Sequence, residues 1–184
     1  MNYNIAKTIM TSYKFLGKIC QRLDDIILQR AKASRHYSAC DAKHFSAYET
    51  ANALIELSER KVELINLKIV VDKVLLNMKS FDAKLLIKRF YHNKKFLELC
   101  QALNISERSC YRCLNRACER FLTEMQKQGY GEEKIMRLLK HHAWMQNFFM
   151  DFEAKSLQAT TAVVSLSANF LGRIANQYKY AVYC

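Results

Sequence analysis

Proline is absent from this chain of 184 residues, and glycine occurs only four times. These two residues interrupt helices most strongly, whereas the abundant Leu, Ala, Lys, Arg, Glu and Gln favour them. We therefore predict a fold that is all-α from end to end. A chain of this length can bury a hydrophobic core without disulfide bonds or bound metal, so a metal ion is not needed for folding.

Long hydrophobic runs are also missing. No stretch of 18 or more apolar residues occurs, and the most hydrophobic late segment, "LQATTAVVSLSANFLG", is short and contains Ser, Thr and Asn. The opening stretch is broken by Lys7, Lys14 and Lys18, so it does not read as a secretory signal. Together with the odd number of seven cysteines, this predicts reduced thiols, a cytoplasmic protein and no membrane span.

The motifs of enzymes and metal sites are lacking as well. There is no glycine-rich phosphate loop, no Ser/His/Asp or Cys/His frame and no pair of carboxylates on one helical face, so we expect no enzyme and no cofactor. A metal cluster can be imagined at His36, Cys40, Asp41 and His44, but their spacing matches no common zinc pattern. We therefore expect no metal site there.

Positive charge is in excess. The chain has 29 Lys and Arg against 17 Asp and Glu, which gives a formal net charge of +12 and a pI of about 9.4. Such a surface favours a polyanionic partner, either nucleic acid or an anionic membrane. Charge alone does not choose between them.

The first part of the chain, residues 1–80, is predicted to form two long helices. In the first helix, apolar residues recur at helical spacing, namely Ile5, Ile9, Leu16, Ile19, Leu23 and Ile27. The basic residues Lys7, Lys14, Lys18 and Arg22 are predicted to form the opposite face. Small polar residues from 32 to 46 indicate a loop, after which the second helix runs from Ala47 to Met78.

The second helix has a seam with alternating steps of three and four residues. Its members are Ile55, Ser58, Val62, Ile65, Ile69, Asp72 and Leu76. Helices use such a seam to pack side by side, although Ser58 and Asp72 interrupt it. Because "LINLKIVVDKVLL" is apolar nearly all round, we expect burial within the bundle, and a homodimer stays possible.

After the middle part of the chain, residues 81–127, a C-terminal helical extension is predicted over 128–184. Gly129 can end a helix, and Glu132 and Glu133 suit the first turn of the next one. We expect that helix to run from about Glu132 to Lys155. A weaker helical stripe follows, at Val163, Leu166, Phe170, Ile174 and Tyr178.

The cysteine-rich run "NKKFLELCQALNISERSCYRCLNRACERF", residues 93–121, fits a helix-turn-helix. The residues that would pack two short helices together are Phe96, Leu99, Leu103, Ile105, Cys110 and Cys113, with the small Cys100 between them. Asn104 would take the left-handed turn and Ser106 would cap the second helix. Cysteine here acts as a small core residue, and a single Cys-x-x-Cys pair makes a poor zinc site.

If these positions are buried, the second helix presents a polar face. That face consists of Glu107, Arg108, Tyr111, Arg112, Asn115 and Arg116. Arg pairs with guanine, Asn with adenine, and Glu accepts from cytosine, so these residue types can read base edges in the major groove. Lys94, Lys95 and Arg120 flank the element where phosphate contacts would position it. A merely charged, solvated helix is the alternative.

The stretch "LLIKRFYHNKKFLELCQALNISERSCYRCLNRACERF" resembles region four of sigma-70-family sigma factors, and is closer to phage transcriptional regulators of the ArpU and RinA type. The resemblance covers about residues 81–125. It implies base reading by Glu107, Arg108, Tyr111 and Arg112, phosphate contacts by Lys94, Lys95 and Ser106, and RNA polymerase as a possible partner. Asn104 in place of the usual glycine, and cysteines at 110, 113 and 118, depart from the pattern.

A full sigma factor also needs a region that opens promoter DNA, and residues 1–80 contain no such pattern. We therefore predict a sigma-like regulator of bacterial or phage origin that binds double-stranded DNA sequence-specifically. The alternative is a helical interaction protein whose basic first helix binds an acidic membrane or another protein. The operator, the sign of regulation and the oligomeric state are not encoded in any recognisable pattern.

Overall fold

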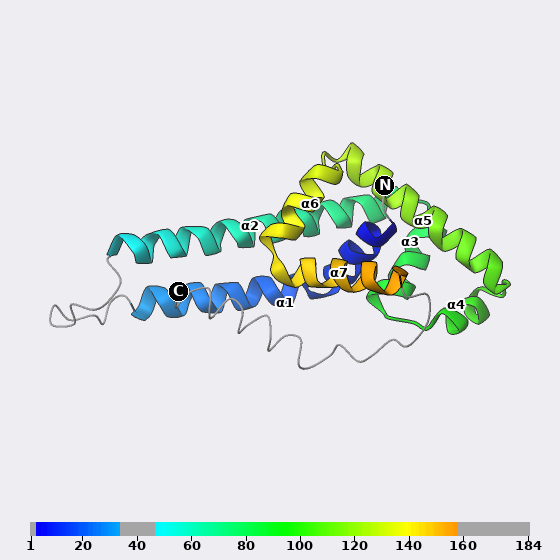
Figure 1. The fold of residues 1–184 in the computed structure, drawn as a ribbon, viewed down its shortest axis with the longest axis horizontal. Coiled ribbons are helices and arrows are strands. Elements are labelled where there is room, and N and C mark those ends of the chain that lie inside the picture. Colours follow the sequence, from blue (N-terminus) through cyan, green and yellow to red (C-terminus); the bar gives the residue numbers. More distant parts are fainter. Residues whose placement is uncertain (1–2, 34–46, 158–184) are drawn as a thin grey trace.

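The computed structural model describes residues 3–33 and 47–157. Over these residues the chain forms seven α-helices and one π-helical turn, without a β-strand, which confirms the all-α prediction (Figure 1). In chain order the elements are α1 (Tyr3–Ala33), α2 (Ala47–Asn77), α3 (Ser80–Leu86), η1 (Ile87–Tyr91), α4 (Phe96–Leu103), α5 (Glu107–Lys127), α6 (Glu132–His141) and α7 (Ala143–Leu157). The metal candidates at 36–44 and the stripe at 163–178 lie outside the described residues.

The helices α1 and α2 form an antiparallel hairpin, running side by side in opposite directions (Figure 1). The apolar stripe predicted for α1 is buried, with Ile5, Ile9, Leu16, Ile19 and Leu23 at most 1% exposed. Polar contacts also join the two helices. The Tyr13 hydroxyl donates a hydrogen bond to Asp72, and Lys61 pairs with Asp24.

The face that α2 buries is not the one its seam predicts. The buried residues of α2 are Leu57, Leu64, Leu67, Val71 and Val74. Most of the predicted seam is exposed instead, from 36% at Ile65 to 84% at Leu76. The predicted burial of α2 within the bundle holds for one side of the helix only, because α2 carries a second apolar face and that face, not the seam, meets α1 and α5.

The cationic face predicted for α1 is only partly open to solvent. Lys14, Lys18 and Arg22 are exposed, as expected. Lys7 differs, because its Nζ lies 4.0 Å from the ring centroid of Phe152 on α7. The helix α7 covers this end of α1, so the Lys7 ammonium makes a cation–π contact with Phe152 and is not surrounded by water alone.

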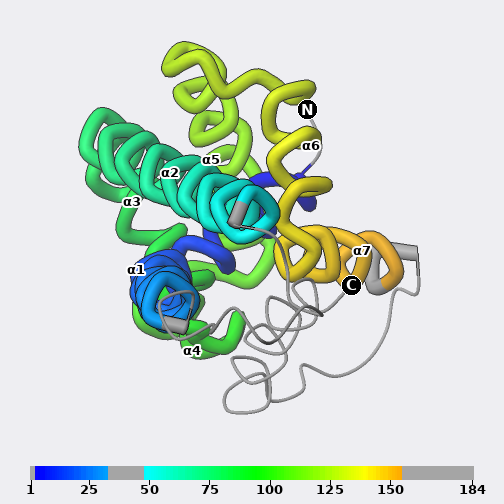
Figure 2. Tube along the Cα trace, turned by 90° about the vertical axis from the view of Figure 1, so that its left-hand side faces the viewer, coloured from blue at the N-terminus to red at the C-terminus, as the bar shows by residue number. Residues whose placement is uncertain are grey.

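The helix predicted from Glu132 to Lys155 is two helices. As expected, Gly129 lies just beyond the end of α5, with φ of 77°, a conformation that glycine adopts without strain. The prediction of a single helix from Glu132 to Lys155 is wrong, because the chain bends at His142, where φ is −116° and ψ is 89°. The bend turns α7 away from α6 and lets α7 pack along α1 (Figure 2).

A single hydrophobic core connects all of these helices. It includes Leu16 of α1, Leu64 of α2, Phe121 of α5 and Trp144 of α7. The division at residues 80 and 127 stays a prediction, and the core extends across both positions. Within residues 3–33 and 47–157, none of the helices combines the length with the hydropathy needed to cross a bilayer.

Candidate nucleic-acid interface

The helices α4 and α5 meet at a sharp turn that begins with Asn104. This residue has φ of 51° and ψ of 45°, the left-handed conformation that was predicted for it. The Ile105 N–H donates to the carbonyl of Cys100 at 3.2 Å, and the Asn104 N–H donates to that of Gln101 at 3.1 Å. These two bonds form the Schellman motif, which satisfies the last carbonyls of α4 and redirects the chain.

Ser106 begins α5 as its N-cap, as predicted. Its Oγ accepts a hydrogen bond from the Ser109 N–H at 3.3 Å, and its hydroxyl donates to the Ser109 hydroxyl at 2.9 Å. The cap satisfies one of the free N–H groups in the first turn. The start of α5 is thereby fixed relative to α4.

The inner side of this helix pair contains the cysteines. Cys100, Cys110 and Cys118 are at most 4% exposed, and Cys113 is half-buried. Burial, together with a hydrogen bond with the Cys100 thiol, raises the pKa of Cys110 to about 12. Burial also raises the pKa of Cys118 to about 12. Cys110 and Cys118 are therefore protonated packing residues, and no metal-binding cluster of His, Cys, Asp or Glu occurs among the described residues.

The outer side of α5 carries the predicted base-reading residues. Glu107, Arg108, Tyr111, Arg112 and Arg116 are exposed, and Asn115 is half-buried. The Tyr111 ring packs edge-on against Phe96 of α4, with 5.5 Å between the ring centroids. All six residues lie in the first half of α5, and Figure 1 shows this half beside α4 at one end of the molecule.

The side of α5 that carries these residues is buried in the second half of the helix. Cys118 and Leu122 are at most 2% exposed, although helical spacing places them on the side that begins with Glu107 and Tyr111. Other helices cover α5 here, α1 among them. The side of α5 that carries Glu107 and Tyr111 is therefore open only over the N-terminal turns of the helix.

The predicted phosphate-contacting residues are divided between two places. Lys94 and Lys95 are exposed just before α4, and Ser106 is exposed at the start of α5. Arg120 lies farther along α5, and its guanidinium pairs with the buried carboxylate of Asp82 on α3. Arg120 thus holds α3 and α5 together and is not grouped with the other three.

Sequence reasoning missed two further candidates, Lys88 and His92. Together with Lys94 they line a shallow groove beside α4. The loop that positions them is held by Arg89, whose side chain donates to the Lys94 carbonyl at 2.9 Å. The run "RFYHNKK" is basic in sequence, but only the fold brings Lys88 next to Lys94.

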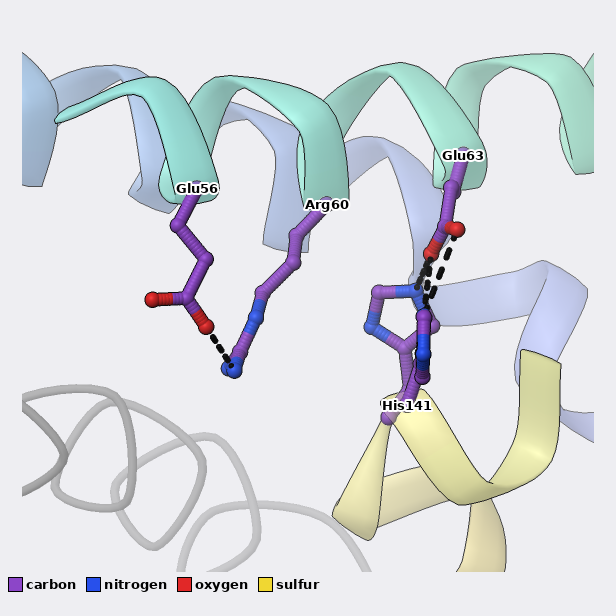
Figure 3. A network of polar contacts seen from close by, with 5 residues as sticks. Glu56, Arg60, Glu63 and His141 are labelled. Carbon is purple, nitrogen blue, oxygen red and sulfur yellow. Dashed lines mark hydrogen bonds and ion pairs between the residues drawn. The ribbon is translucent and has the colours of Figure 1, made fainter. Parts of the chain in front are cut away.

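A second polar cluster ties the C-terminal helices to α2 (Figure 3). His142, which is fully buried at the bend between α6 and α7, places its Nε2 3.2 Å from the carboxylate of Glu63. His141 Nδ1 lies 3.4 Å from the same carboxylate, and Arg60 pairs with Glu56 on the neighbouring turn. Burial lowers the pKa of His142 to about 4, although the Glu63 charge opposes this shift. The neutral imidazole therefore has a structural role.

Comparisons of this chain with protein families, with curated proteins and with solved structures return no match.

Proposed function

We propose that this protein binds double-stranded DNA sequence-specifically and regulates transcription, with the first turns of α5 in the major groove. The observation that supports this most directly is the two-sided character of the α4–α5 pair. Apolar residues and thiols fill its inner side, while Arg108, Arg112 and Arg116 extend from the outer side of α5. In helix-turn-helix proteins, residues near the N-terminus of the second helix contact base edges.

Each outward residue has a chemical role in this proposal. Arg108 and Arg112 donate bidentate hydrogen bonds to guanine, and Glu107 accepts from cytosine. Tyr111 and Arg116 contribute at the edges of the site. Asn115 is half-buried, so its reach to a base depends on how closely α5 approaches the groove.

Phosphate contacts would position α5 on the duplex. Lys94 and Lys95 flank the start of α4, and Ser106 is exposed at the start of α5. The newly found Lys88 and His92 lie on the same flank as Lys94. With a net charge of +12, most of the affinity would come from phosphate neutralisation and counterion release. Binding should therefore weaken steeply with added salt.

The resemblance to sigma region four and to phage regulators supports the same proposal from the sequence. One departure from that pattern, Asn104 for glycine, is accommodated by a left-handed backbone that asparagine tolerates. Contact with RNA polymerase is proposed on this resemblance alone. Regulation without catalysis and a cytoplasmic location complete the proposal.

The alternative, membrane binding through α1, has weaker support. An interfacial helix inserts its apolar face between lipids. In α1 the residues Ile5, Ile9, Leu16, Ile19 and Leu23 of that face are at most 1% exposed, and the helix packs against α2, α5 and α7. Membrane insertion would require the core to open.

The test is an unbiased selection of duplexes bound by the purified full chain, followed by affinity measurements on the recovered site. Arg112→Ala is expected to weaken binding to that site by about 1–3 kcal/mol and to relax the preference at one base pair. Arg137→Ala is the matched control, because Arg137 is an exposed arginine on α6, away from the α4–α5 pair. It should reduce affinity equally for all sequences, if at all.

Two outcomes would count against the proposal. If the selection recovers no motif, sequence-specific binding is wrong. If a motif is recovered but both Arg108→Ala and Arg112→Ala leave the preference unchanged, α5 does not read the bases. Sedimentation with anionic vesicles at matched ionic strength tests the alternative.

A further inference from the structure

The helix α2 is apolar on two opposite faces. One face, which includes Leu64, Val71 and Val74, is fully buried against α1 and α5. At 100° per residue, the seam from Ile55 to Leu76 is centred on the opposite side of the helix. Its large apolar members are exposed by 56% at Ile55, 53% at Val62, 36% at Ile65, 45% at Ile69 and 84% at Leu76. A helix that is apolar all round is normally covered on every side.

The spacing of this exposed face indicates which kind of partner would cover it. Alternating steps of three and four residues keep a stripe facing one neighbouring helix along its length. From Ile55 to Leu76 the stripe is about 32 Å long. A second long helix therefore fits this face better than a globular surface or a lipid layer would.

One end of the stripe contains a hole and the other end a matching knob. Ile55, Ser58, Glu59 and Val62 line an open, mostly apolar groove, at whose rim Leu54 and Glu63 also lie, and Ser58 has the smallest side chain of the six. Four residues at this spacing form the hole that receives one side chain of a facing helix in a coiled coil. Leu76, near the other end, is the most exposed large hydrophobic residue of the described chain.

We propose that the exposed face of α2 binds the same face of a second copy of this chain, with the two α2 helices antiparallel. A two-fold axis at the level of Leu67 places Leu76 of each copy in the groove around Ser58 of the other, because both residues lie nine positions from Leu67. The same axis places Ile65 against Ile69 at the centre of the interface. The knob and the hole are then each used twice, as two-fold symmetry requires.

The charges beside the stripe complement each other in this orientation. Glu59, Asn66 and Lys73 form one row beside the stripe, at intervals of seven residues. Glu59 and Lys73 are both exposed, and in the antiparallel pair Glu59 of one copy lies near Lys73 of the other. Asn66 faces its own counterpart, and an amide can both donate and accept a hydrogen bond. Lys68 also approaches its own counterpart, but its ion pair with Asp72 at 3.0 Å offsets the like charge.

A parallel pair would lack these contacts. It would place Asp72 against Asp72 of the second copy and Lys68 beside Lys73 of the second copy. Like charges at such positions oppose association. It would also place Leu76 against Leu76 and leave the groove around Ser58 without a knob. The structure therefore favours the antiparallel pair.

The size of the stripe limits the expected affinity of the proposed dimer. A strip about 32 Å long and about 10 Å wide has a footprint of roughly 300 Å² per copy. Standard stable interfaces bury about 800 Å² per partner. We therefore expect a weak dimer, which forms and dissociates as the protein concentration changes.

The first experiment is sedimentation equilibrium of the full chain without DNA over a range of concentrations. The wild type should pass from monomer to dimer. Leu76→Ser should weaken the dimer about a hundredfold, because each dimer loses two knobs. Leu28→Ser is the matched control, since Leu28 on α1 is also exposed but lies off the stripe, and it should leave the dimer unchanged. Circular dichroism would verify that both variants keep the helical fold.

The second experiment tests orientation by charge reversal. Glu59→Lys and Lys73→Glu should each weaken the dimer about tenfold, because the pair occurs twice. The double variant should restore the wild-type constant, since the reversed charges again face each other. If the wild type forms no dimer, or if Leu76→Ser has the same dimer dissociation constant as the wild type, the proposed surface is wrong. Loss in Leu76→Ser without rescue in the double variant would overturn the antiparallel register.

This inference does not rest on DNA binding, because both experiments are carried out without nucleic acid. A failed DNA selection would leave the dimer in place, and a monomeric protein would leave the proposed role of α5 in place.

Discussion

Removal of the Arg120 guanidinium should destabilise the fold and not merely weaken DNA binding. Arg120 pairs with Asp82, whose side chain is only 7% exposed. Breaking a buried pair by removing one partner costs about 3–5 kcal/mol, because the remaining charge is left buried and unpaired. The Arg120 side chain is 42% exposed, so water already screens part of the attraction. We therefore expect Arg120→Ala to lower the free energy of unfolding by about 2 kcal/mol.

The assay is urea unfolding of the full chain at neutral pH, followed by far-ultraviolet circular dichroism. Arg116→Ala is the matched control, because Arg116 is an exposed arginine one turn earlier on α5. That change should alter stability by less than about 0.5 kcal/mol. The double variant Asp82→Asn and Arg120→Ala should be more stable than Arg120→Ala alone, since it leaves no unpaired carboxylate.

The refuting result is specific. If Arg120→Ala unfolds like Arg116→Ala and the Asp82→Asn change restores nothing, the α3–α5 ion pair does not stabilise the fold. If the variant is fully stable but binds duplex DNA more weakly, Arg120 is the phosphate contact that the sequence alone predicted.

Three further predictions concern the same helices. Because the native pKa of His142 is about 4, below the ordinary value of 6.5, the unfolded chain binds a proton that the native state excludes, so stability should fall as pH drops from 6.5 towards 4. From pH 7 to 5.5 the loss in urea unfolding should be about 1 kcal/mol, and a pH profile unchanged in His142→Gln would contradict this. Cys110 and Cys118 should react with a thiol reagent only after unfolding, as mass mapping of labelled peptides would reveal, and rapid labelling of the native protein would disprove their burial. Ser106→Ala should lower the unfolding free energy by about 1 kcal/mol through loss of the N-cap, whereas a change near zero would show that the cap is unimportant.

Local structure around the candidate interface could be predicted from the sequence because its determinants are near one another in the chain. Asn104 takes the left-handed turn, Ser106 caps α5, and Cys110 packs inside, each as its type and position indicated. These choices depend on backbone sterics, on unsatisfied N–H groups and on the alternation of apolar residues within a few turns. The bases that α5 would read, and a role for RNA polymerase, stay predictions.

Contacts between residues far apart in the chain could not be predicted in this way. His142, at the bend between α6 and α7, contacts Glu63, which lies 79 residues earlier. The ion pair that occupies Arg120 depends on Asp82, 38 residues earlier. Nothing in the local pattern around 142 or 120 identifies these partners, so the predicted single helix from 132 to 155 was wrong and Arg120 was assigned to phosphate.

The sequence by itself determined that this protein is helical, and it placed the start of α2 at Ala47 and the turn between α4 and α5. The tertiary structure alone decided which side of α2 faces the core. Two sets of apolar residues recur on α2 at helical spacing, one through Leu64 and Val71 and the other through Val62 and Ile69. Periodicity shows that each set forms a face, but burial depends on which face α1 and α5 can reach, and that is a property of the packed helices together.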